Sequence, residues 1–212
     1  PSSGVVSNRV SMPSRSLVKW WAKLAAKSAA GVLPVSPQMW KRIGVFDHGP
    51  MESPEYACSV FEKHFQHFER IRTARGLANR EFQCLELGPG SSLASCVIAK
   101  ACGAKKCVMV DIADLALVDA SVYRGLGRYL NQHELPAPNL EDVDNVQAVL
   151  KLCGGLYMTA GLESLEKLPA KSFDFIWSHT VLQHIDRTEL VETLKELRRV
   201  IRPDGIASHE VD

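Results

Sequence analysis

The sequence lacks the features of several large classes of protein. No stretch approaches the roughly 18 unbroken apolar residues of a membrane span, and lysines interrupt the N-terminal segment too often for a signal peptide. No charge of one sign dominates, because 25 Lys and Arg face 24 Asp and Glu, a formal net charge of +1. This near balance of basic and acidic residues argues against a protein whose main function is to bind nucleic acid phosphates. We therefore predict a cytoplasmic protein with no nucleic acid partner.

Paired cysteines are also missing. None of the six cysteines forms a Cys-x-x-Cys pair, so the spacing of a zinc knuckle is absent. Several lie inside apolar runs, as Cys84 and Cys107 do. We predict that they are small buried apolar side chains in a reducing compartment.

The chain divides into three segments by composition. Residues 1–36 begin with a Ser-, Pro- and Gly-rich stretch that looks disordered and continue as an amphipathic helix over 14–33, with a basic residue every fourth position. This helix either packs on its own domain, which we favour, or rests on an anionic membrane surface. Residues 37–80 are predicted to form a helical lid or cap, and residues 81–212 form the core domain.

The lid segment carries clear helix boundaries. Ser53 followed by Pro54 is typical of a helix start, and apolar residues at helical spacing continue to about Arg75, where Gly76 ends the helix. His64 and His67, three residues apart, have a spacing that can bind a metal ion. No cysteine or carboxylate stands at a matching spacing, so we predict no metal site there.

From Glu81 onward, short apolar strands alternate with helices. We predict five strands, at residues 83–87, 106–111, 156–159, 173–178 and 206–211. The helices are predicted at 92–102, in a stretch ending near 131, at 143–153 and at 189–201. Strands interleaved with helices imply an α/β fold with a parallel sheet covered on both faces.

A glycine-containing turn joins the first of these strands to the following helix. Gly88 and Gly90 would let a ligand approach the main chain closely. The position of the third glycine in a dinucleotide-binding loop is Leu93, so the usual pyrophosphate cradle is missing. Glu86 precedes the turn, where it could lie near an ammonium group, and Asp111 ends the second strand, where a carboxylate can accept hydrogen bonds from a ribose diol.

The stretch from Glu86 to Asp111 resembles motif I and the following acidic strand end of class I S-adenosylmethionine-dependent methyltransferases. Residues 173–185, FDFIWSHTVLQHI, and 197–205, LRRVIRPDG, resemble two further motifs of that family in the expected order. The resemblance covers about residues 81–212. It implies a Rossmann-like, doubly wound sheet of strand order 3-2-1-4-5 with S-adenosylmethionine as cofactor. The family's sheet has seven strands, so we expect a core truncated before strands six and seven.

The resemblance also implies a set of site residues. Those expected to bind the cofactor are Glu86, Gly88, Pro89, Gly90, Asp111, Ile112, Glu163, Trp177 and Ser178. His184 and His179 are the candidates for a catalytic base, and a structural role for His184 remains an equal alternative. His209 and Asp212 are placed to line the acceptor pocket. The sequence departs from the family at Ser92, where many relatives have glycine, and at Gln183, where they have glutamate.

The acceptor is expected to be a small molecule, a lipid or a saccharide. Residues 44–56 and 208–212 further resemble a bacterial subgroup linked to surface-polysaccharide biosynthesis. Two other functions stay open. One is an NAD- or nucleotide-sugar-dependent oxidoreductase, which Leu93 argues against, and the other is a non-catalytic module that binds the cofactor or a partner.

Overall fold

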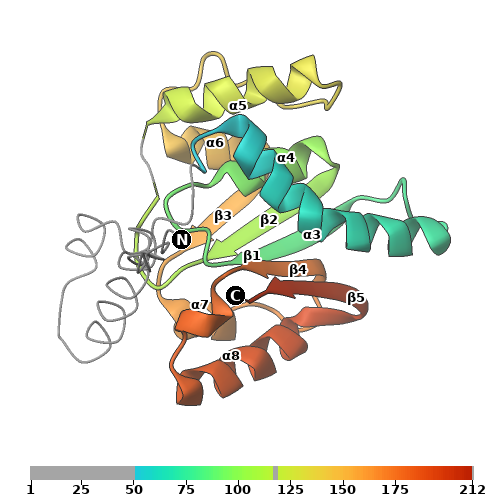
Figure 1. Ribbon diagram of the computed structural model, residues 1–212, viewed down its shortest axis with the longest axis vertical. Helices are drawn as coiled ribbons and strands as arrows, with labels where there is room; N and C mark the ends of the chain where they lie inside the picture. Colours follow the sequence, from blue (N-terminus) through green and yellow to red (C-terminus); the bar gives the residue numbers. More distant parts are fainter. Residues whose placement is uncertain (1–50, 117–118, 212) are drawn as a thin grey trace, which may run out of the picture. The chain divides into compact units, whose positions relative to one another are not determined.

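The structure is a computed structural model that describes residues 51–116 and 119–211 (Figure 1). Five parallel strands form one sheet in the order β3-β2-β1-β4-β5, which confirms the predicted fold class and strand order. The strands are β1 (Phe82–Leu87), β2 (Ala104–Val110), β3 (Gly155–Met158), β4 (Phe173–His179) and β5 (Ile201–Glu210). Chain order reverses between β1 and β4, and such a switch point is where ligands bind open α/β sheets.

Helices cover both faces of this sheet (Figure 1). On one face lie α3 (Pro54–Ala74), α4 (Ala94–Ala101), α5 (Ala120–Gln132) and α6 (Val146–Cys153). On the other lie α7 (Gly161–Glu166) and α8 (Arg187–Val200), with the short 3-10 helix η1 (Leu182–His184) between β4 and α8. Buried apolar residues form two clusters, one on each face, because successive strand residues point to opposite sides.

Helix α3 begins and ends as the sequence predicts. The Ser53 hydroxyl accepts a hydrogen bond from the backbone N–H of Tyr56, and Pro54 occupies the first turn. Gly76 follows the helix with a φ of +70°, a conformation that glycine adopts without strain. The buried face of α3 packs against the sheet through Phe61, whose ring meets Trp177 edge-on at 5.7 Å.

Two parts of the core differ from the prediction. Strand β5 begins at Ile201 instead of residue 206, because residues 202–205, between the predicted helix and the predicted strand, form a bulge inside the strand. Phe173 pairs with Ile201 and Phe175 with Ile206, so five residues of β5 span two residues of β4. Helix α7 was not predicted, because six residues are too few to show helical periodicity.

All six cysteines are free, and Cys84, Cys96, Cys107 and Cys153 are buried in the core, as predicted. Burial raises the pKa of the half-buried Cys58 thiol to about 11, so the thiol is un-ionised at neutral pH. No helix in the described part of the chain is long and apolar enough to cross a membrane. The amphipathic helix predicted over 14–33 lies outside the described residues, and the three segment boundaries stay predictions.

Candidate functional site

The turn after β1 is held against the end of β2. Gly88 and Gly90 have φ values of +72° and +66°, which favour glycine at both positions. The N–H of Gly88 donates to the carbonyl of Val110 at 2.8 Å, and the N–H of Gly90 donates to Asp111 Oδ2 at 2.9 Å. Pro89, between them, is buried. The glycine turn and the acidic strand end therefore form one structural unit.

Asp111 can serve both the turn and a ligand. The side chain is buried, with Oδ2 accepting from Gly90 and Oδ1 accepting from the N–H of Ile112 at 2.8 Å. Burial raises the pKa of this carboxyl above its usual value, and the two N–H donors oppose that rise. Because each carboxylate oxygen has two acceptor sites, one site on each oxygen remains for a ribose diol.

The two glycines have different surroundings. A Cβ built on Gly88 would lie 2.5 Å from Cγ2 of Val181, which belongs to the motif after β4. A Cβ built on Gly90 would meet no heavy atom of the described residues within 4 Å. Because Gly88 has no side chain, its backbone can pack against Val181, which follows β4. A ligand would instead find open space beside the backbone at Gly90. At Gly88 the side-chain direction is filled by Val181, and contact of Gly88 with a ligand stays a prediction.

Glu86 lies buried at the end of β1 and accepts a hydrogen bond from the Ser95 hydroxyl in the first turn of α4. Burial raises the pKa of Glu86 to about 8, the Ser95 donor opposes that rise, and the charge of Asp111 adds to it. A carboxyl in this state is mostly neutral at pH 7 and would gain an ionic partner if a cation approached.

Two backbone N–H groups at the start of α4 already have partners within the protein. The N–H of Leu93 donates to the Tyr123 hydroxyl at 3.2 Å, and the N–H of Ala94 donates to the Ser92 hydroxyl at 3.2 Å. Free N–H groups at a helix start are what a phosphate needs. Protein oxygens occupy two of them here, so the loop suits a ligand without phosphate.

The start of α7 adjoins the end of β2. The N–H of Gly161 donates to the Asp111 carbonyl at 2.8 Å, and a Cβ on Gly161 would lie 3.5 Å from Ile112 Cγ2. Ile112 is 73% exposed, which is unusual for an isoleucine and leaves an apolar surface beside the turn. Glu163 is exposed in the first turn of α7. The structure thus brings Ile112 and the helix that carries Glu163 next to Asp111, and their contact with the cofactor stays a prediction.

The end of β4 does not present its three candidate residues to one side. Trp177 packs under α3, with its ring 5.1 Å from that of His64. Ser178 is fully buried, and its hydroxyl lies 2.8 Å from His209 Nδ1 on β5, on the opposite face of the sheet. Trp177 and His179 therefore point to one face of the sheet and Ser178 to the other, and the contacts of these residues with cofactor or acceptor stay predictions. Strand alternation alone would have separated Ser178 from its two neighbours.

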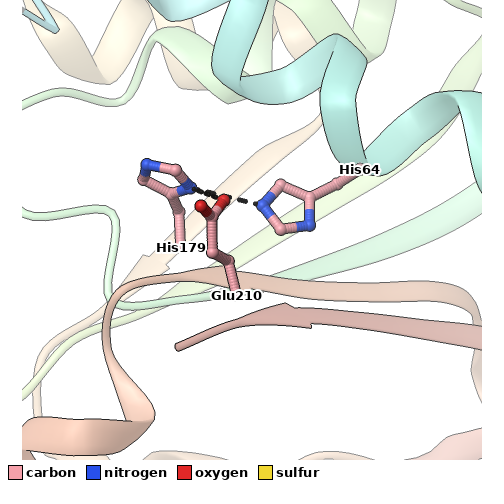
Figure 2. Close-up of side chains that lie close together, drawn as sticks. All are labelled: His64, His179 and Glu210. Atoms are coloured by element: carbon pink, nitrogen blue, oxygen red, sulfur yellow. Dashed lines mark hydrogen bonds and ion pairs between the residues drawn. The ribbon is translucent and has the colours of Figure 1, made fainter. Parts of the chain in front are cut away.

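The two candidate bases lie in different surroundings. His179 lies in a polar cluster, and His184 lies outside that cluster. His179 Nδ1 is 2.9 Å from Glu210 Oε2 and 3.4 Å from His64 Nε2 (Figure 2). His184 is exposed in η1. Burial lowers the pKa of His64 to about 4, with the nearby His179 as the second cause, so His64 is neutral at pH 7.

Sequence reasoning singled out His64 only as a partner of His67, and it missed Glu210. The structure separates the two histidines of α3, because His64 is buried and His67 is exposed beside Arg70. Glu210 is a single acidic residue near the end of β5, and its contact Lys63 lies 147 positions earlier in the chain. Nothing in the local sequence around Glu210 indicates that contact. Asp212, the other residue predicted for the acceptor pocket, lies outside the described residues.

Comparisons with known proteins give one family match and several similar solved structures. A family model described as methyltransferase domain matches residues 85–208. A solved structure from Pyrococcus horikoshii is 16% identical, with a TM-score of 0.45 over 84% of this chain and 63% of that one. An S-adenosylmethionine-dependent methyltransferase from Mesorhizobium loti is 18% identical, with a TM-score of 0.39 over 68% of this chain and 53% of that one. The chain thus spans less than two thirds of the length of either protein.

No curated protein matches the chain. The family match confirms S-adenosylmethionine as the predicted cofactor.

Proposed function

The chain belongs to the methyltransferase-domain family, and we propose that it transfers a methyl group from S-adenosylmethionine to a small-molecule, lipid or saccharide acceptor. The observation that carries the proposal is the hydrogen bond from the Gly90 N–H to Asp111 Oδ2. It fixes an open glycine turn beside a buried carboxylate at the point where chain order reverses in the sheet. The glycine turn beside the Asp111 carboxylate supports binding of an adenosyl group that carries no phosphates.

The residues fit the chemical parts of the cofactor. Asp111 has acceptor sites for a ribose diol, Ile112 offers an exposed apolar side chain to a flat base, and Glu86 can face an ammonium group. S-adenosylmethionine supplies the methyl group on a sulfonium, so the protein mainly has to bind and align the two reactants. We propose these three residues, with Gly90, as the core of the cofactor site.

The acceptor side of the site lies nearer to β5 in this proposal. His179 ends β4 and contacts Glu210, whereas His184 is exposed in the turn that follows. His179 is therefore the better placed of the two to meet an acceptor. The narrower assignment to surface-polysaccharide biosynthesis rests only on the sequence resemblance of residues 44–56 and 208–212.

Calorimetric titration of S-adenosylmethionine into the protein tests the proposal. Asp111→Ala should weaken binding by about 1–3 kcal/mol, the value of hydrogen bonds to a charged group. Asp144→Ala is the matched control, since this exposed aspartate lies in the loop before α6. No binding to the parent protein, or equal binding to the parent and Asp111→Ala, would overturn the proposed cofactor site. A parallel titration with NAD, expected to give no heat, separates the oxidoreductase alternative.

A further inference from the structure

Three potential metal ligands from distant parts of the chain meet at the carboxyl end of β4. His64 comes from α3, His179 ends β4 and Glu210 ends β5 (Figure 2). One ring nitrogen of each histidine and one oxygen of Glu210 lie within 4.8 Å of one another. Two imidazoles and a carboxylate are the ligand set of many catalytic zinc sites and of non-haem iron sites.

The separations between these atoms suit a shared ion. Ligands about 2.0–2.1 Å from a metal stand roughly 2.9–3.0 Å apart in octahedral geometry and roughly 3.3–3.4 Å apart in tetrahedral geometry. The observed separations are 2.9 Å between His179 Nδ1 and Glu210 Oε2, and 3.4 Å between His64 Nε2 and His179 Nδ1. The third separation, between the ligand atoms of His64 and Glu210, is at most 4.8 Å. The Glu210 side chain is 26% exposed, so it has room to move closer to His64.

The Glu210 carboxylate has one oxygen in need of a partner. Lys63 Nζ lies 2.6 Å from Oε1. Oε2 is buried and accepts no hydrogen bond from any residue in the described part of the chain, although His179 Nδ1 is 2.9 Å away. The two atoms are close without the geometry of a hydrogen bond. A buried carboxylate oxygen without a donor is costly, and a cation would remove that cost.

Neighbouring groups hold the ligands in position. His64 Nδ1 lies 2.9 Å from the Ser208 hydroxyl, so a proton on Nδ1 leaves the Nε2 lone pair directed at the cluster. His64 is buried, and its ring packs on Trp177, which fixes the plane of the imidazole. His179 and Glu210 are half-buried, so the cluster is open to solvent on one side.

We propose that His64, His179 and Glu210 bind one divalent first-row transition-metal ion of the zinc or iron class. Three protein ligands leave at least one coordination position for water or for an oxygen of a second molecule. With Nδ1 on a metal, His179 holds the ion and does not take a proton from an acceptor. Metal binding goes beyond the proposed methyl transfer and needs no S-adenosylmethionine.

Titration of chelator-treated protein with Co2+, followed by its visible absorption, tests the site directly. The folded parent protein should bind one ion per chain, and Glu210→Gln should weaken that binding at least about a hundredfold, because a ligand is lost. Ser208→Ala should weaken it by about 10–100-fold, the usual effect of removing a group that orients a metal-bound histidine. X-ray absorption of the zinc form should show two imidazole ligands.

His67→Ala is the matched control, because His67 is an exposed histidine on the same helix and should not affect binding. Circular dichroism of each variant confirms that it folds, and Glu210→Gln changes a half-buried side chain without changing its size. Absence of stoichiometric Co2+ binding by the parent would overturn the proposal. Equal affinities of Glu210→Gln and His67→Ala would overturn it as well, whatever the outcome of the cofactor titration.

Discussion

Binding of S-adenosylmethionine at pH 7 should release a proton from Glu86. Burial raises the pKa of this carboxyl to about 8 from 4.5, so it is roughly nine-tenths protonated at pH 7 in the cofactor-free protein. An ammonium group placed beside it favours the ionised form. We therefore expect the release of up to about 0.9 proton per cofactor bound, if the ammonium group brings the pKa well below 7.

Calorimetry in two buffers measures this release. The apparent binding enthalpy should differ between phosphate and Tris by the proton number times the difference in buffer ionisation enthalpy. Glu86→Gln should abolish the difference, and Glu81→Gln, an exposed acid just before β1, should retain it. Equal enthalpies in the two buffers for the parent protein would refute the placement of the ammonium group at Glu86.

The same carboxyl should make stability depend on pH. The difference between 4.5 and about 8 corresponds to roughly 5 kcal/mol, an upper value for so deeply buried a group. The folded protein holds this proton more tightly than the unfolded chain, so the stabilisation is complete below pH 4.5 and is lost as the pH rises through 8. Urea unfolding between pH 5 and 9 should show most of this loss in the parent and a flatter profile in Glu86→Gln.

Three further predictions concern stability and are tested by urea unfolding. Gly88→Ala should destabilise the protein by about 1–3 kcal/mol or more, because the new methyl group would meet Val181 at 2.5 Å in a strained backbone conformation. Gly90→Ala should cost only about 1–2 kcal/mol, since the strain remains but the space is open. Arg72→Lys should cost at least about 1–3 kcal/mol, because the buried guanidinium donates to three backbone carbonyls between residues 77 and 80 and a lysine cannot reproduce that fork.

Local patterns were sufficient to predict most of the sheet. Each of the strands β1 to β4 contains a short apolar run next to a turn signal, and the contact between Gly90 and Asp111 follows from the spacing of one strand–turn–helix–strand unit. The Ser53 cap and the Gly76 stop depend on chemistry within four residues, and the structure has both. These features were predictable because sequence neighbours determine them.

Features set by residues far apart in the chain were not predictable. The partner of Gly88 is Val181, which fills its side-chain space from another motif. His64 and His179 are separated by 115 positions, and nothing near either residue indicates the other. The bulge in β5 has a similar origin, because the Phe173 carbonyl and Ile201 closely surround Gly205 only after β4 and β5 pair.

The cofactor residues and the histidine cluster share one face of the sheet but should act independently. Trp177 on β4 is paired with Glu86 on one side and with Ser208 on the other, so two strand spacings, roughly 10 Å, separate those backbones. Glu86 on β1 and Glu210 on β5 are separated by β4, and side chains that far apart that do not contact each other usually couple by less than about 0.5 kcal/mol. Glu210→Gln should then leave the affinity of the metal-free protein for S-adenosylmethionine unchanged. Glu86→Gln should likewise leave Co2+ binding unchanged, because a mostly neutral carboxyl is replaced by a neutral amide. A tenfold effect in either cross-test would mean that the two groups of residues form a single site.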